Sequence, residues 1–260
     1  MCGALLTGLI ALPALAQDEV PFIVTPDHVT LAMLELAQVG SRDHVIDLGS
    51  GDGRIVITAA KRFGARGLGV ELVPDLVERS RDNARRAAVA DRVEFRVQDL
   101  FDTDLAPATV VTMYLLPAVN LQLRPRLLAL KPGTRIVSHD WDMGDWEPDA
   151  TRVIAVPDKL VGHEKLSRVH LWRVPARFEG LWCGADGTGL HVTQRYQRLQ
   201  AQGVGRASSW AGSAQGAQAT LNAADGVPIT LRAHADTQRL DLASAGGTQV
   251  LRLRAGPTCR

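Results

Sequence analysis

The chain has 260 residues, a hydrophobic content of 46% and a formal net charge of +1, from 29 basic and 28 acidic side chains. This length suits one large domain, or one domain with a small companion, and the apolar content excludes a disordered chain. The near-neutral charge provides no basic footprint for a nucleic acid or an acidic membrane.

Residues 1–17 form a short apolar run that ends in Ala14-Leu15-Ala16. This ending is typical of a cleaved signal peptide, although the basic residues that usually begin one are missing. The run is too short to span a bilayer as a helix, so we expect no stable membrane span after its removal. A buried N-terminal helix is the alternative. The expected location is periplasmic or secreted if the segment is a signal peptide, and cytoplasmic otherwise.

Removal of this segment would also remove Cys2 and leave Cys183 and Cys259. An even pair in an exported chain is compatible with one disulfide. The spacing alone does not show that the two are bridged.

The next segment holds a Thr25-Pro26 turn and an apolar-periodic helix that begins near Val29. The apolar run at residues 44–48 predicts a buried strand, and apolar periodicity at residues 55–63 predicts a helix. Between them lie three glycines, which allow a tight turn and a close approach of the backbone to a ligand. A strand, a glycine turn and a helix begin a nucleotide-binding α/β unit.

The spacing of Gly49, Gly51 and Gly53 differs from the dinucleotide pattern G-x-G-x-x-G, because the third glycine comes one residue early. The carboxylates of Asp47 and Asp52 would repel a phosphate, and the phosphate-loop pattern with Lys and Ser/Thr is absent. Acids combined with glycines suit a nucleoside that has a cationic end and no phosphate. S-adenosylmethionine meets this description, and the stretch resembles motif I of class I methyltransferases.

Two further strands carry acids at their ends. The strand at residues 67–72 places Glu71 about twenty residues past the glycine turn, where an acid can accept both ribose hydroxyls. A helix over 74–88 follows. The strand at residues 92–97 leads to Asp99, which we expect to accept the adenine amino group while Leu100 packs against the ring.

The second half of the predicted sheet begins with a strand at residues 108–117, which ends in Met113-Tyr-Leu-Leu-Pro117. Enzymes that methylate DNA bases or glutamine often carry Asn/Asp-Pro-Pro-Tyr/Phe here, so this ending argues against base methylation. The remaining predicted elements are a helix at 119–130 and strands at 134–139, 151–155 and 170–174.

These segments together resemble the protein-lysine methyltransferases that modify the c-subunit of the mitochondrial ATP synthase and the adenine nucleotide translocase, with their prokaryotic relatives. The resemblance rests on Val20-Pro-Phe22, on Asp47 to Val56, on Gly69 to Leu72, on Asp99 to Phe101, on Leu115-Leu-Pro117, and on Val137-Ser138 with Trp146-Glu-Pro148. One departure is Phe101, which replaces a common Trp.

The resemblance covers about three-fifths of the chain and implies an α/β fold, with a Rossmann-like seven-stranded methyltransferase sheet over residues 18–175. It implies S-adenosylmethionine as the cofactor. The expected cofactor contacts are Thr25, Asp47, Gly49, Ser50, Gly51, Glu71, Leu72, Asp99 and Leu100.

Methyl transfer requires a nucleophile held about 3 Å from the methyl group, in line with its bond to sulfur. Candidate catalytic residues are Tyr114, His139 and Asp140, and candidate substrate contacts are Trp141 and Trp146, because all lie at the carboxyl ends of the fourth and fifth strands. Packing roles for the tryptophans and for His139 are the alternative. The histidines lack the spacing of metal ligands, so no metal is expected.

Residues 176–260 are rich in Gly, Ala, Ser, Thr and Gln. Short alternating runs separated by Gly turns predict a small antiparallel β module, either a meander or a partial barrel. The runs lie at 189–199, 217–221, 228–232, 239–242 and 248–253.

The sequence therefore predicts an S-adenosylmethionine-dependent methyltransferase that acts on a protein lysine, with no nucleic-acid partner. A small-molecule N- or O-methyltransferase is the first alternative. The second is a cofactor-binding interaction module without turnover. The pattern predicts no oligomeric state.

Overall fold

The computed structural model describes residues 23–159, 164–205, 207–223, 226–234 and 238–259. The predicted signal segment and Val20-Pro-Phe22 lie outside the described residues. Among the helices that the structure describes, none is long and apolar enough to cross a membrane.

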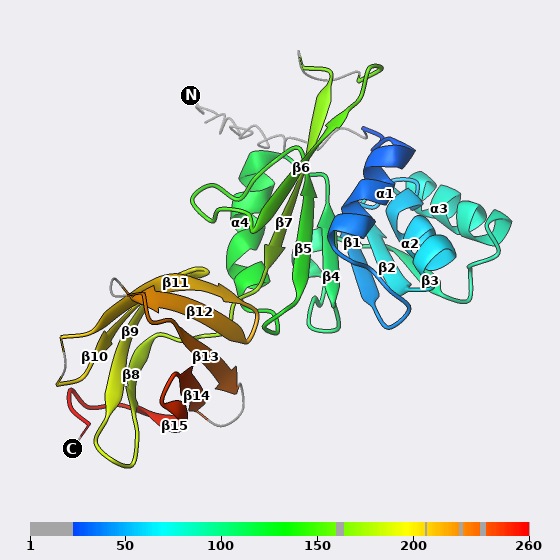
Figure 1. Cartoon of the computed structure of the whole chain (residues 1–260). Helices are drawn as coiled ribbons and strands as arrows, with labels where there is room; N and C mark the ends of the chain where they lie inside the picture. The colour runs from blue at the N-terminus through cyan, green and yellow to red at the C-terminus, as the bar shows by residue number, and fades with distance from the viewer. Residues whose placement is uncertain (1–22, 160–163, 206, 224–225, 235–237, 260) are drawn as a thin grey trace, which may run out of the picture.

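A seven-stranded sheet forms the first domain, with the strand order β3-β2-β1-β4-β5-β7-β6 (Figure 1). Strands β3 to β5 in this order are parallel, whereas β7 runs antiparallel to both of its neighbours. The strands are β1 (His44–Leu48), β2 (Arg66–Glu71), β3 (Val93–Val97), β4 (Val110–Met113), β5 (Arg135–His139), β6 (Ala150–Ala155) and β7 (Leu166–Arg173). The predicted α/β sheet is confirmed.

Helices cover both faces of this sheet (Figure 1). They are α1 (Asp27–Leu36), α2 (Arg54–Phe63), α3 (Pro74–Arg86) and α4 (Pro117–Leu128). Alternate strand residues face opposite sides. Val45 accordingly packs in the core beneath α1 and α2, whereas its neighbour Ile46 packs in the core that α4 covers.

The chain from residue 180 onward forms a closed antiparallel barrel, in the order β10-β11-β12-β13-β14-β15-β8-β9. Its strands are β8 (Gly180–Cys183), β9 (Gly189–Arg195), β10 (Arg198–Gly203), β11 (Ser209–Gln215), β12 (Gln218–Ala223), β13 (Ile229–His234), β14 (Arg239–Ser244) and β15 (Gly247–Arg254). The predicted β module is confirmed, but the meander and the partial barrel are corrected to a closed barrel. Closure leaves no unpaired sheet edge.

One predicted run of the barrel is wrong in detail. Residues 189–199 do not form a single strand, because Tyr196 adopts a left-handed backbone with φ of 53° and the chain turns back on itself. The sequence also did not predict β8 and β11, which are short or rich in small residues.

A disulfide joins Cys183 on β8 to Cys259, which follows β15. The bridge therefore fastens the end of the chain to the barrel wall. Gly189 makes room for it, because a Cβ atom there would lie 2.4 Å from the sulfur of Cys259.

The barrel is attached where the parallel strands begin, at the opposite end of the sheet from their carboxyl termini (Figure 1). Val174 continues from β7 and exchanges backbone hydrogen bonds with Gly133 and Thr134, while the N–H of Ala176 donates to the carbonyl of Gly216 on the barrel. The module therefore does not cover the edge where α/β sheets bind their ligands.

Candidate functional site

The glycine turn after β1 is built from left-handed backbone. Gly49, Gly51 and Gly53 have φ values of 74°, 54° and 78°. The N–H groups of Gly49 and Ser50 donate to the carbonyl of Val70 at 3.0 and 2.9 Å. At Gly53 a Cβ atom would lie 2.7 Å from the ring of Phe95, so glycine is needed there for space as well as for conformation. The turn is therefore fixed against β2.

Glu71 at the end of β2 binds this turn directly. Its Oε2 accepts from the N–H of Gly51 at 3.0 Å, and its Oε1 accepts from those of Leu72 and Val73 at 2.8 and 3.1 Å. A carboxylate has about four lone-pair sites and three of these are occupied, so one acceptor position remains for a ribose hydroxyl. The arrangement fits the ribose of S-adenosylmethionine.

Asp47 lies beneath the turn. It is 2% exposed, and its Oδ1 accepts from the hydroxyl of Thr112 at 2.7 Å. Burial raises the pKa of Asp47 to about 7, with added repulsion from Glu71 and Asp52. A cationic ligand suits this concentration of acidic groups better than a phosphate does, because opposite charge stabilises the ionised acids.

Ser50 is also turned inward. Its hydroxyl is buried without a hydrogen-bond partner among the described residues, and it lies 2.7 Å from the position a Cβ atom would take on Gly69. The roles predicted for Asp47 and Ser50 as cofactor contacts stay predictions.

Asp99 stands at the start of a short 3-10 helix, η1 (Leu100–Asp102), and its side chain accepts from the N–H of Phe101 at 2.8 Å. The N–H of the preceding Gln98 donates to the carbonyl of Glu71 at 2.9 Å, so this segment is fixed beside Glu71. Leu72 and Phe101 are exposed large hydrophobic residues on the same edge and offer surface for an aromatic ring. Leu100 itself is only partly buried, against the core.

His139 ends β5 and connects three elements. Its Nδ1 is 3.2 Å from Oγ1 of Thr25, and its Nε2 is 2.8 Å from Oγ of Ser167. Burial lowers the pKa of His139 to about 4, so the ring is neutral at pH 7. Thr25 is thereby fixed over the carboxyl end of the sheet, where Arg54 also binds its carbonyl at 2.9 Å.

Tyr114 and Asp140 form the outer part of the same group. The ring of Tyr114 lies 4.0 Å from that of His139, and its hydroxyl donates to Oδ2 of Asp140 at 3.4 Å. Burial, with Asp140 nearby, raises the pKa of Tyr114 to about 12. Although burial alone would raise the pKa of Asp140, hydrogen bonds from Lys159 and from the Arg168 backbone hold it below its ordinary value. Tyr114 therefore remains protonated beside an ionised Asp140 at pH 7.

Comparison with known proteins identifies the family of this chain. Residues 47–150 match the ANTKMT methyltransferase domain. A protein-lysine N-methyltransferase of Saccharolobus islandicus is 43% identical over 147 residues, which cover 56% of this chain and 90% of that protein. The chain belongs to this methyltransferase family.

Two further relatives agree. A human lysine N-methyltransferase of the ATP synthase c-subunit is 32% identical over 162 residues, covering 56% of this chain and 69% of that protein. The crystal structure of an RNA methyltransferase from Salinibacter ruber, in complex with S-adenosyl-L-homocysteine, is 52% identical with a TM-score of 0.54, covering 60% of this chain and 96% of that one. This chain is accordingly a methyltransferase that uses S-adenosylmethionine. The predicted family, cofactor and enzyme class are confirmed.

In this methyltransferase the two predicted substrate tryptophans have different environments. Trp141, two residues past β5, is 40% exposed beside Asp140. Trp146 is 0% exposed and packs between Trp172, at 6.0 Å, and Tyr196 of the barrel, at 5.9 Å. The substrate role predicted for Trp146 does not fit this burial, so we correct it to a packing residue of the barrel interface.

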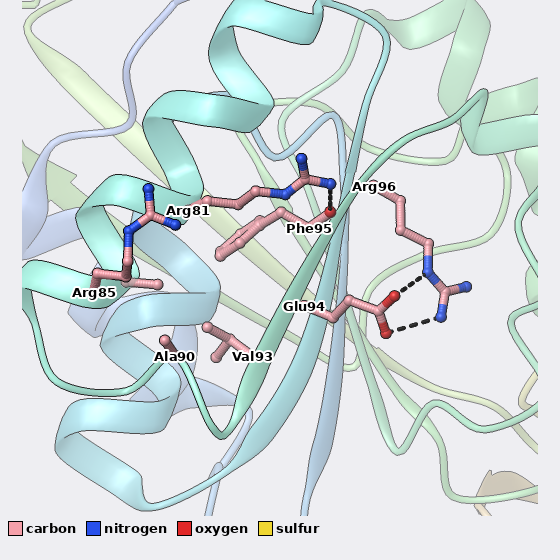
Figure 2. Close-up of a pocket in the computed structure, with 8 residues that line it drawn as sticks. Arg81, Arg85, Ala90, Val93, Glu94, Phe95 and Arg96 are labelled. Carbon is pink, nitrogen blue, oxygen red and sulfur yellow. Dashed lines mark hydrogen bonds and ion pairs between the residues drawn. The ribbon is translucent and has the colours of Figure 1, made fainter.

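The methyltransferase also has a cavity of about 290 Å³ between α3 and β3, on the outer edge of the sheet (Figure 2). Three arginines surround it, and each has a partner: Arg81 binds the carbonyl of Phe95, Arg85 pairs with Asp82, and Arg96 pairs with Glu94. Since the three guanidinium groups are already paired, this cavity offers no concentration of free positive charge.

Sequence reasoning missed Lys159, Ser167 and Arg168, which contact His139 and Asp140. With Tyr114, these two residues form the group at the carboxyl ends of β4 and β5 that we call the acceptor edge. The three missed residues lie on or beside the β6–β7 hairpin, whose register brings Arg152 opposite Val169. No local pattern marks these residues, because their positions depend on pairing between strands distant from the glycine turn.

Proposed function

We propose that this methyltransferase transfers a methyl group to the ε-amine of a lysine side chain in a protein. The observation that carries the proposal is the pairing of an aromatic ring with an ionised acid, Tyr114 with Asp140, at the carboxyl ends of β4 and β5. An aromatic face and a carboxylate both attract an alkylammonium group. The relatives named as lysine methyltransferases of proteins, one of them acting on the ATP synthase, support the same acceptor.

In the proposed complex Glu71, at the end of β2, accepts from a ribose hydroxyl, and Asp99, two residues past β3, accepts from the adenine amino group. When bound, S-adenosylmethionine supplies a methyl group on a cationic sulfur. The acids around the glycine turn provide a negative environment for that charge, because the partners of Asp47 and Glu71 in the described part of the chain are a hydroxyl and backbone N–H groups, not cations. Arg54 pairs instead with Asp52 and Asp27.

The acceptor lysine must lose a proton, since its ordinary pKa is about 10.4. Asp140 is placed to accept a hydrogen bond from the amine once the ammonium proton has passed to solvent, and the protonated Tyr114 orients Asp140 from the other side. The nitrogen lone pair would then bond to the methyl carbon as the carbon–sulfur bond breaks, and S-adenosylhomocysteine would leave. His139 is an unsuitable base because it is buried and both ring nitrogens have partners. The catalytic role predicted for His139 therefore becomes, in this proposal, one of positioning Thr25 and the ring of Tyr114.

An RNA acceptor is the competing class, because the Salinibacter ruber protein is named an RNA methyltransferase. The acidic residues of the loop that follows β5 argue against an RNA acceptor. Asp140 and Asp142 flank the exposed Trp141 at the start of this loop, while Asp145 and Glu147 farther along are already paired with Arg195 and Arg198, and the net charge of the chain is only +1. Backbone phosphates usually bind clusters of Lys and Arg, so this loop favours a cationic acceptor.

The test is methyl transfer from labelled S-adenosylmethionine to two separate acceptor pools, a bacterial protein extract and total RNA, followed by mass spectrometry of the products. We expect label on protein lysines, and none with Glu71→Ala. Label on RNA alone, or on small molecules alone, would overturn the proposed acceptor. The matched control is Glu78→Ala, which removes an exposed carboxylate from α3.

We also propose that the protein works outside the cytoplasm. The A-x-A pattern at Ala14-Leu15-Ala16 supports a signal peptide, and the bridge between Cys183 and Cys259 suits an oxidising compartment. A fusion of the full chain to a reporter that fluoresces only in the cytoplasm should remain dark. Fluorescence with residues 1–17 intact would contradict export.

A further inference from the structure

One lysine of the chain already lies at the acceptor edge. Lys159 follows β6, and its Nζ is 2.7 Å from Oδ2 of Asp140 and donates to the carbonyl of Leu166 at 2.6 Å. The side chain is only 14% exposed, whereas lysines are usually solvated. The ammonium group is therefore enclosed between a carboxylate and a carbonyl.

Asp140 is held in an unusual backbone conformation that fixes this arrangement. Its φ of 63° lies in the left-handed region, which non-glycine residues adopt when their surroundings hold them there. Its N–H donates to the carbonyl of Arg168 at 2.6 Å, and its Oδ1 accepts from the N–H of Arg168 at 2.9 Å. Oδ2 faces Lys159, the hydroxyl of Tyr114 and, at 3.5 Å, Nε2 of the neutral His139.

The two acceptors match what a lysine nucleophile needs. A neutral amine has two N–H bonds and one lone pair. When the N–H bonds donate to Oδ2 of Asp140 and to the carbonyl of Leu166, the lone pair is free for a methyl group. A protonated amine is held by the same two oxygens, so the acceptor can bind before it loses its proton.

We propose that Oδ2 of Asp140 and the carbonyl of Leu166 form the subsite for the acceptor amine, and that Lys159 is an internal occupant which the acceptor lysine displaces. This inference rests on the proposed lysine acceptor. It identifies the ligand class of the subsite as a primary alkylammonium. It also makes Lys159 a determinant of affinity, because an internal amine competes with every incoming one.

A neighbouring ion pair of this hairpin differs from the Lys159 pair. Arg168 pairs with Glu164 four residues away, and the two side chains are 45% and 60% exposed. The Lys159 and Asp140 side chains are 14% and 13% exposed and come from different loops. The enclosed pair of Lys159 and Asp140 is the one that contacts Tyr114, a predicted catalytic residue.

The experiment measures binding of n-butylamine to the full chain in the presence of S-adenosylhomocysteine, by calorimetry. Lys159→Ala empties the subsite and should bind the amine at least about tenfold more tightly than wild type, as expected if wild type is open about one-tenth of the time. Lys61→Ala, on the exposed surface of α2, is the matched control and should bind as wild type does. Asp140→Asn in the Lys159→Ala background should abolish the gain.

Equal affinity in Lys159→Ala and Lys61→Ala would overturn the inference, as would an undiminished gain in the Asp140→Asn double variant. If Lys159→Ala does not fold, Lys159→Gln keeps a hydrogen-bonding side chain without the charge, and the same comparison applies. Methyl transfer to protein lysine by the wild type is measured separately. Its absence would refute the proposed acceptor, whereas the binding comparison reports on the subsite without turnover.

Discussion

Asp47 is a residue whose ionisation depends strongly on the fold. Its pKa is about 7 in the folded chain, against an ordinary value of 3.8. Below about pH 4 the acid is protonated in both states. As the pH rises toward 7 the unfolded chain releases this proton while the folded chain retains it, so folding becomes less favourable. The free energy of unfolding should therefore fall across this window.

Asp47→Asn should remove this decline, because an amide does not ionise and its oxygen can still accept from Thr112. Three pKa units correspond to about 4 kcal/mol, an upper limit for the gain of the variant over wild type between pH 4 and pH 8. Urea unfolding of both proteins at the two pH values measures it. A variant that loses stability relative to wild type as the pH rises would contradict the raised pKa.

Glu71→Gln should weaken binding of S-adenosylhomocysteine by about 1–3 kcal/mol, or roughly 5- to 150-fold in Kd, because a charged acceptor is lost at the ribose. Glutamine retains one oxygen for the backbone N–H groups that Glu71 now holds. Calorimetry gives the affinity, and Glu78→Gln on α3 is the control. Equal affinities for the two variants would show that Glu71 does not contact the cofactor.

At the scale of elements, the two ends of α2 allow steric crowding to be separated from backbone strain. Gly53 precedes the helix and Gly64 follows it, and both are left-handed, with φ of 78° and 69°. A Cβ atom at Gly64 would meet only an ordinary contact at 3.4 Å, whereas one at Gly53 would lie 2.7 Å from the ring of Phe95.

Gly64→Ala should therefore cost about 1 kcal/mol of unfolding free energy from backbone strain, and Gly53→Ala clearly more, because Phe95 and the turn must also move. Only Gly53→Ala should also weaken binding of S-adenosylhomocysteine. Denaturant unfolding and calorimetry on both variants provide the measurements. Equal losses of stability would show that the contact with Phe95 relaxes without effect.

The glycine turn was predictable because its function requires a local pattern. Three glycines, one strand end and one acid at Glu71 occur within about twenty-five residues and specify the cofactor. The acceptor edge was only partly predictable. Tyr114 and Asp140 follow strands of the same sheet, but Lys159 reaches Asp140 through the pairing of β6 with β7, which no local periodicity encodes.

Trp146 was assigned to the wrong environment for a similar reason. Its place in an acidic, aromatic loop suggested an exposed site, whereas its actual partner, Tyr196, lies fifty residues further along in the barrel. A sequence-based argument could predict the β module from its alternating runs, but not which turn of that module docks on which loop.

At the scale of the whole molecule, the disulfide belongs to the barrel alone. Replacing both Cys183 and Cys259 by serine opens a loop of 76 residues and should lower the stability of the barrel by about 2–4 kcal/mol. Binding of S-adenosylhomocysteine should not change, because the barrel adjoins the end of the sheet opposite the glycine turn (Figure 1). Thermal unfolding measures the stability, and calorimetry measures the affinity for S-adenosylhomocysteine. A loss of cofactor affinity would show that the two domains are coupled.

The loop after β5 connects the acceptor edge with the barrel. It begins at Asp140, and near its other end Asp145 accepts from the hydroxyl of Tyr196 at 3.0 Å and pairs with Arg195 at 2.8 Å. The ring of Tyr196 stacks on Trp146 at an interplanar angle of 22°. The barrel thus holds the far end of the loop that carries Asp140, and we expect it to position the acceptor edge.

Tyr196→Ala should therefore lower the rate of methyl transfer at saturating cofactor while leaving the affinity for S-adenosylhomocysteine unchanged, since the backbone of the glycine turn is held by Val70 and Glu71 of β2 and not by this loop. Tyr196→Phe keeps the stacked ring, which contributes about 0.5–1.5 kcal/mol, and should retain most of the rate. Single-turnover kinetics and calorimetry separate the two quantities. A parallel loss of rate and cofactor affinity in Tyr196→Ala would indicate general unfolding, and an unchanged rate would show that the barrel does not act on the acceptor edge through this loop.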